Sequence, residues 1–354
     1  MPSPTTSALL ALFSLAVYAS AQTYSTCNPT INTTCSSDAG LSSSTYSVDF
    51  TTGSDDTNWN TTSGNISYTS SGAEFTITQQ GDSPTIQTTW YFFFGTLEVH
   101  IRAAPGIGIV SSIVLESDDL DEIDWEFLGG NSASVETNYF GKGNTTSYDR
   151  AVYYAVDDNQ STSHNYTVDW TTESITWYID GVSTRTLAYE DALNGANFPQ
   201  TPMRIQLGIW AGGDPELNAE GTVEWAGGDV NYDDGPFTMY VESVKVTNFN
   251  PAKSYTYGDQ AGDYSSIELG NNTVSASASG NVQTGIGNAD NGDTNGTVAN
   301  ASSTANASGT VVAQTTATSG FTVSSGGYSL IWGSSATLMV QGLRGAACGL
   351  NAEA

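Results

Sequence analysis

Residues 121–127 read Asp-Glu-Ile-Asp-Trp-Glu-Phe, and acidic and apolar side chains alternate strictly from residue 122 onward. Alternation with a period of two is typical of a β-strand that packs one face against a core, because successive side chains point to opposite faces. Three carboxylates, Glu122, Asp124 and Glu126, then share one face of this strand. The apolar side chains between them anchor the other face.

Comparable alternating runs recur at residues 74–78, 95–101, 174–179 and 237–241. Asp180-Gly181 follows the third run and is a hairpin turn signal. No long stretch has helical periodicity, and Gly, Asn and Asp punctuate the chain between the runs. The pattern predicts an all-β sandwich over residues 46–250.

Three carboxylates on one strand face disfavour folding, because like charges at close range raise one another's pKa. A site that keeps one carboxylate ionised and another protonated can supply the nucleophile and the general acid/base of retaining glycoside cleavage. Such enzymes hold the two groups about 5–5.5 Å apart, whereas four residues of straight strand span roughly 13 Å. We therefore expect Glu122 and Glu126 to lean inward over the shorter Asp124, which would hydrogen-bond the nucleophile.

Two other interpretations of the acidic face stay open. It could be the solvated outer face of an ordinary antiparallel strand. It could also bind calcium, which prefers carboxylate oxygens, but a calcium site usually adds backbone carbonyls and a glycine turn that this segment lacks. We predict no metal and no cofactor.

The charge balance restricts the binding partners. The 354 residues include eight Lys and Arg against 37 Asp and Glu, for a formal net charge of −29. The negative electrostatic field of such a chain repels phosphate backbones and anionic lipid headgroups. We therefore exclude nucleic acid as a partner and favour a neutral polymer. No oligomeric state follows from the sequence.

The N-terminal sequence indicates secretion. An apolar run at residues 8–17 and Ala-Ser-Ala at residues 19–21 predict a signal peptide over residues 1–21. Ten Asn-x-Ser/Thr sequons agree with passage through a secretory compartment. In that oxidising environment Cys27 and Cys35, close together in the mature chain, predict a local disulfide, and Cys348 is left over.

The composition changes after the β-rich region. Residues 256–327 become rich in Ser, Thr, Asn and Gly, which predicts a disordered, glycosylated linker after a folded domain at residues 22–255. Residues 328–354 contain a modest apolar run that is too short to span a bilayer. This end is interpreted either as a GPI-anchor signal, which would attach the protein to the plasma membrane, or as an ordinary tail.

The carboxylate strand closely resembles the Glu-x-Asp-x-Glu strand of glycoside hydrolase family sixteen. Residues 103–120, 137–143, 202–214 and 221–228 resemble the fungal Crh subgroup of cell-wall transglycosylases. The resemblance covers residues 22–255. It implies a concanavalin-like β-jelly-roll sandwich with a concave substrate cleft.

The resemblance also implies the chemistry and the location of the protein. Glu122 would be the nucleophile, Asp124 the assisting residue and Glu126 the proton donor and base. A chitin-type donor would be cleaved and passed to a β-glucan or chitin acceptor in the secreted, wall-associated protein. Two rival functions stay open: a plain hydrolytic β-glucanase or chitinase, and a non-catalytic wall lectin.

Candidate substrate-binding residues lie on a second strand. Alternation puts Arg204, Gln206 and Trp210 on one face, and Trp210 could stack on a sugar ring. Thr222 and Trp225 are added from the resemblance alone. Core packing is the competing explanation for either Trp, most strongly for Trp225.

Overall fold

The computed structural model describes residues 25–271. The signal-peptide prediction for residues 1–21, the leftover Cys348 and the predictions for residues 272–354 lie outside the described residues.

One large sheet carries the acidic strand. Its seven strands are all antiparallel to their neighbours. Their order is β11 (Val152–Ala155), β10 (Ser134–Phe140), β9 (Glu122–Leu128), β8 (Ile109–Ser117), β15 (Met203–Ala211), β6 (Thr85–Thr88) and β3 (Trp59–Ser63).

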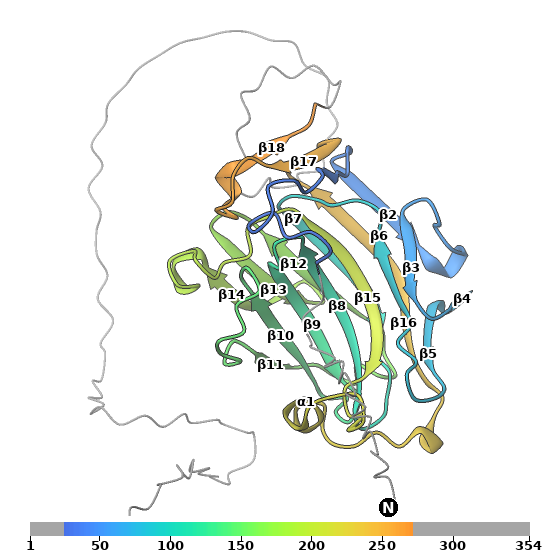
Figure 1. Cartoon of the computed structure of the whole chain (residues 1–354). Helices are drawn as coiled ribbons and strands as arrows, with labels where there is room; N and C mark the ends of the chain where they lie inside the picture. The colour runs from blue at the N-terminus through green and yellow to red at the C-terminus, as the bar shows by residue number, and fades with distance from the viewer. Residues whose placement is uncertain (1–24, 272–354) are drawn as a thin grey trace, which may run out of the picture. The chain divides into compact units, whose positions relative to one another are not determined.

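A second sheet, of eight strands, packs behind the first, and the long strands of both layers curve (Figure 1). Its main path runs β14 (Val182–Ala188), β13 (Ser174–Ile179), β12 (His164–Trp170), β7 (Gly95–Arg102), β16 (Phe237–Asn248), β5 (Gly72–Ile77) and β4 (Ile66–Thr69). β2 (Thr45–Asp49) pairs with β16 beside this path. The predicted all-β sandwich is confirmed.

The core lies between the two sheets and is built from the inward-facing member of each alternating pair. On β9 these are Ile123, Trp125 and Phe127, each at most 1% exposed. Trp125 and Phe127 contact Tyr166 of β12, with ring centroids 5.2 and 4.7 Å apart. The apolar side of the acidic strand is therefore fixed against the opposite sheet, as the alternation predicts.

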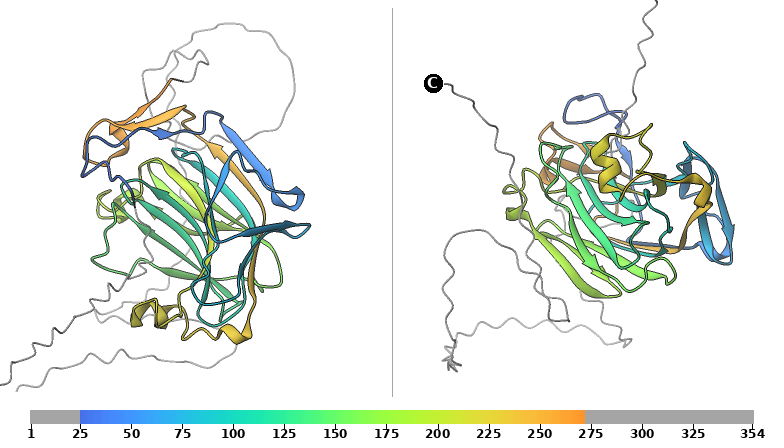
Figure 2. Two further views of the ribbon diagram at one scale, coloured as in Figure 1. Left: turned by 45° about the vertical axis from the view of Figure 1, so that its right-hand side comes forward. Right: turned by 90° about the horizontal axis from the view of Figure 1, so that it is seen from below.

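Helical structure in residues 25–271 is limited to α1 (Glu220–Trp225) and four three-residue turns, η1 (Phe50–Thr52), η2 (Tyr189–Asp191), η3 (Tyr232–Asp234) and η4 (Tyr264–Ser266). None of the described helices is long and apolar enough to cross a membrane. α1 lies at one end of the sandwich, where β15 ends (Figures 1 and 2).

A small third sheet lies at the opposite end from α1 (Figures 1 and 2). It is formed by β1 (Asp38–Ala39), β17 (Ser254–Tyr257) and β18 (Ile267–Leu269). The folded region thus continues past residue 255, where composition predicted the start of a disordered linker. The reason is that Tyr255 and Ile267 enter the hydrophobic core, at 0% and 7% exposure.

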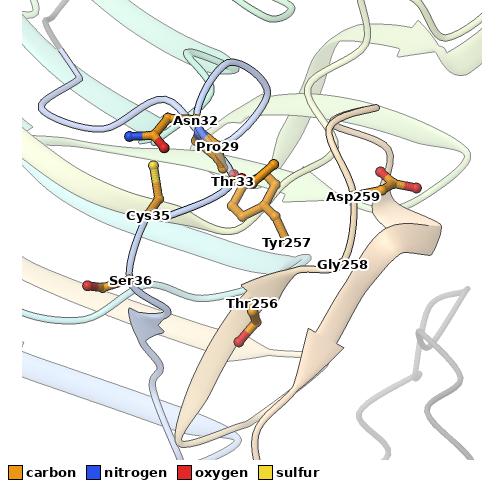
Figure 3. Close-up of a pocket in the computed structure, with 9 residues that line it drawn as sticks. All are labelled: Pro29, Asn32, Thr33, Cys35, Ser36, Thr256, Tyr257, Gly258 and Asp259. Atoms are coloured by element: carbon orange, nitrogen blue, oxygen red, sulfur yellow. The ribbon is translucent and has the colours of Figure 1, made fainter.

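The predicted disulfide between Cys27 and Cys35 is confirmed. It closes a loop that lies against β17 and the residues after it. Together they line a hollow of about 150 Å³ with polar side chains including Asn32, Thr256 and Asp259 (Figure 3). This hollow lies at the third sheet, so it is separate from the acidic strand.

Candidate active site

Strand β9 presents the carboxyl groups of Glu122, Asp124 and Glu126 on the face opposite the core. Glu122 and Asp124 are almost fully buried, at 4% and 2% exposure, whereas Glu126 is partly exposed. The shared face that alternation predicts is therefore present. The inward lean of the two outer side chains stays a prediction.

The register of the sheet aligns other side chains with this face, because directly opposite residues on antiparallel strands point to the same side. Glu122 lies between Phe140 of β10 and Glu116 of β8, and Glu116 lies opposite Arg204 of β15. Two residues further along β9, Asp124 lies between Asn138 of β10 and Val114 of β8. The same row of directly opposite residues continues across the sheet through Gln206 of β15 and Gln87 of β6 to Asn60 of β3. Arg204 and Gln206 thus share the acidic face.

The carboxyl groups of Glu122 and Asp124 influence one another's protonation. Burial is the main cause that raises the pKa of each well above its ordinary value, and neighbouring carboxylates add to it. A hydrogen bond between the two side chains lowers the pKa of Glu122 and raises that of Asp124. This interaction favours the proton on Asp124 over Glu122, while burial raises the pKa of both groups.

Burial also raises the pKa of Glu126 well above its ordinary value, followed in effect by the charges of Asp124 and Glu136. A carboxyl group with a raised pKa holds its proton near neutral pH and can donate it. All three carboxyl groups of the strand therefore have raised pKa values, chiefly because of burial.

The turn before β9 is held rigidly. The Ser117 hydroxyl donates to Asp119, and the Asp121 backbone N–H donates back to the Ser117 hydroxyl at 2.9 Å. Asp121 in turn accepts hydrogen bonds from the backbone N–H groups of Lys142 and Gln200, at 2.8 and 2.7 Å. These contacts fix where β9 begins and therefore where Glu122 lies.

The polar side chains predicted on β15 contact the acidic face through Glu116. Gln206 Nε2 donates to a carboxylate oxygen of Glu116. Arg204 lies 4.0 Å from the same oxygen and 3.8 Å from Asp118. Because Glu116 raises the pKa of Glu122, Arg204 and Gln206 act on the Glu122 end of the site through Glu116.

Trp210 and Trp225 meet at the Glu126 end of the site. Their rings stack with centroids 6.0 Å apart and planes 25° from parallel, and both are partly exposed. Trp225 comes from α1, where Thr222 precedes it by one turn and is also partly exposed. Core packing is therefore the wrong explanation for these two Trp residues, in contrast to Trp59, Trp90, Trp170 and Trp177, which are buried.

Sequence reasoning did not single out Glu116 or Glu136 as members of the site. Each lies on a neighbouring strand directly opposite a carboxylate of β9: Glu116 opposite Glu122, and Glu136 opposite Glu126. The signal that could have found them is hairpin register, because antiparallel pairing of three successive strands aligns these positions. Register depends on the turn lengths, which composition and alternation do not determine.

Within residues 25–271, no group of three or more His, Cys, Asp or Glu side chains is arranged to hold a metal ion.

A curved β-sandwich that presents three carboxyl groups on one strand face near two partly exposed Trp rings has the features of a polysaccharide-processing enzyme. The model of the glycosyl hydrolases family 16 matches residues 53–227. Crh-like protein 1 of Aspergillus fumigatus is 56% identical over 266 residues, which cover 75% of this chain and 72% of that protein. The chain belongs to glycosyl hydrolase family 16.

Two further comparisons lie in the same part of the family. Crh-like protein 5 of A. fumigatus is 58% identical over 250 residues, 71% of this chain, and the match spans 63% of the length of that relative. A solved structure of the Crh5 transglycosylase in complex with NAG has a TM-score of 0.67 at 57% identity, covering 69% of this chain and 99% of that one.

Proposed function

We propose that the protein is a retaining transglycosylase of the fungal cell wall that cleaves chitin-type β-glycan donors and transfers them to β-glucan or chitin acceptors. The observation that carries the proposal is that Glu122, Asp124 and Glu126 share one face of β9 while its apolar face packs in the core, and burial raises the pKa of all three carboxyl groups. Similarity to a transglycosylase solved with NAG supports a donor built from N-acetylglucosamine.

In the first half of the reaction, the Glu122 carboxylate attacks the anomeric carbon of the donor. Glu126 gives its proton to the glycosidic oxygen, so the C–O bond breaks and the leaving chain departs with a free hydroxyl. Asp124 keeps its proton and donates a hydrogen bond to Glu122. The product is a glycosyl ester on Glu122.

In the second half, Glu126 is a carboxylate and removes a proton from an incoming hydroxyl group. The oxygen of that group bonds to the anomeric carbon while the ester bond to Glu122 breaks, which restores both carboxyl groups to their starting forms. Two displacements at one carbon retain the β configuration. A sugar hydroxyl gives transfer, and water gives hydrolysis.

The rest of the acidic face supplies a binding surface for sugars. The stacked Trp210 and Trp225 offer partly exposed rings at the Glu126 end, on which pyranose rings can stack. Gln206, Gln87 and Asn60 form a row of amides across the sheet from Asp124. Polar groups along such a row suit an uncharged, hydroxyl-rich polymer, in agreement with the strongly negative chain.

The test is a product assay with a chitin oligosaccharide donor and a fluorescent β-glucan oligosaccharide acceptor. We expect labelled hybrid products from the native protein and none from Glu122→Gln, while Glu74→Gln on the outer face of the other sheet keeps full activity. Release of reducing ends without hybrid products would indicate a plain hydrolase. Sugar binding with no turnover would indicate a lectin.

The location is part of the proposal: a secreted protein of the cell wall, attached to the plasma membrane if residues 328–354 act as a GPI-anchor signal. The Cys27–Cys35 disulfide supports an oxidising environment. Fractionation of cells that express the full chain, followed by phospholipase release, tests it. Recovery of the protein only in the cytosol would contradict the location.

A further inference from the structure

Glu136 is a buried carboxylate beside the acid/base that the steps above do not use. It lies directly opposite Glu126 in the register of β9 and β10 and is 1% exposed. Directly opposite residues of an antiparallel pair have Cβ atoms about 4.5–5.5 Å apart and point to the same face. Two carboxyl groups this close interact strongly, because the buried environment screens them poorly.

Two hydrogen-bond donors hold the Glu136 carboxylate. Trp225 Nε1 donates to Oε2 at 2.8 Å, and the indole group can only donate. Tyr153, which lies opposite Glu136 on β11, supplies a second hydrogen bond. Burial raises the pKa of Glu136, and these two bonds and the nearby Arg185 oppose that rise. Both donors match the ionised form, which only accepts hydrogen bonds.

Several ionisable groups surround Glu126. The groups that face it are Glu122 and Asp124 on β9, Ser112 on β8, Glu136 on β10, Tyr153 on β11 and, through its bond to Glu136, Trp225 of α1. The charges of Asp124 and Glu136 both raise the pKa of Glu126. Glu136 is the one of these two that Trp225 and Tyr153 hold with hydrogen-bond donors, and this geometry suits its ionised form.

We propose that Glu136 is a positioning residue for the reaction: its negative charge keeps Glu126 protonated before the first step, and its hydrogen bond fixes the Trp225 ring against Trp210. This inference rests on the proposed function, which gives Glu126 the role of acid. The same charge assists the second step, because an ionised Glu126 beside Glu136 is a stronger base toward the incoming hydroxyl group.

The test compares the native protein with Glu136→Gln, in which the amide oxygen can still accept from Trp225 and Tyr153 while the charge is removed. We expect the basic limb of the pH profile of kcat/KM to move down by about one to two pH units. Glu74→Gln changes the net charge equally on the outer face of the other sheet and should leave the profile unchanged.

A second readout does not depend on activity. The Glu126 carboxyl carbon is titrated by ¹³C NMR in protein labelled at glutamate, with its signal identified by its absence in Glu126→Gln. A fall in the pKa of Glu126 in Glu136→Gln supports the proposal even if no hybrid product forms, in which case only the proposed function fails. An unchanged titration and an unchanged basic limb overturn the charge role, and so does a loss of rate without a shift.

The positioning of Trp225 is tested by Trp225→Phe, which keeps a ring and loses the donor. We expect KM for the oligosaccharides to rise several-fold, with a smaller movement of the basic limb than in Glu136→Gln. An unchanged KM would overturn this half of the proposal.

Discussion

The hydrogen bond from Asp124 to Glu122 can be removed and restored by substitution. Asp124→Ala deletes the donor, while Asp124→Asn replaces the carboxyl O–H with an amide N–H that can still donate. Hydrogen bonds to charged groups are worth about 1.5–3 kcal/mol. Since about 1.4 kcal/mol corresponds to a tenfold change in rate, Asp124→Ala should lower kcat/KM by about 10- to 150-fold.

The pH dependence gives a sharper expectation than the rate. The hydrogen bond from Asp124 lowers the pKa of Glu122, so its loss should raise that pKa and move the acidic limb of the profile to higher pH. Asp124→Asn should retain most of the rate and keep the acidic limb near its native position. The assay is the initial rate of hybrid product formation across the pH range.

Stability must be measured in parallel, because Asp124 is 2% exposed and its truncation leaves a cavity. If a variant unfolds at or below the assay temperature, its rate cannot be interpreted. The melting temperature of each variant is therefore measured, and assays are run well below it. Equal rates for Asp124→Ala and Asp124→Asn, with no shift of the acidic limb in either, would refute the assignment of Asp124 as the proton-bearing partner.

Three other predictions follow from separate regions. Trp210→Ala should raise KM for oligosaccharides about tenfold, since an aromatic stacking surface of about 1.5 kcal/mol is lost; an unchanged KM would remove Trp210 from the binding surface. Burial and the neighbouring Asp118 raise the pKa of Asp38 from 3.8 to about 8, so its contribution to stability is full below 3.8 and is lost as pH rises from there to about 8. Asp38→Asn should therefore lessen the fall in melting temperature over this range, and an unaltered pH dependence would contradict this. In protein secreted from a eukaryotic host, Asn65, which is exposed in the turn between β3 and β4, should carry a glycan, whereas Asn159, which is 1% exposed and donates to a backbone carbonyl, should be found unmodified by mass spectrometry.

Strict alternation was enough to predict the strand at residues 122–128 and the side on which each of its residues lies. Because side chains alternate with a period of two, the face of every residue on the strand is fixed once Trp125 and its apolar neighbours enter a core. The same argument placed Gln206 and Trp210 correctly on β15. Local sequence patterning predicts the two faces of these strands, because a half-buried strand requires apolar side chains on its core face along its whole length.

Residues that reach the site through long-range pairing could not be predicted in this way. Glu136 joins Glu126 only because β9 and β10 pair in one particular register. Trp225 reaches the site from a short helix after β15. It does not pack in the core, because α1 lies at the end of the sandwich. Composition likewise missed β17 and β18, because a few apolar side chains suffice to hold short strands in a polar segment.

The configuration of the first product tests the retaining mechanism most directly. Proton NMR of a fresh reaction with a chitin oligosaccharide records the anomeric signal before mutarotation mixes the two forms. If Glu122 forms a glycosyl ester that Glu126 helps to resolve, the β-anomer must appear first and the new linkage in any hybrid product must be β. Initial formation of the α-anomer would contradict the account.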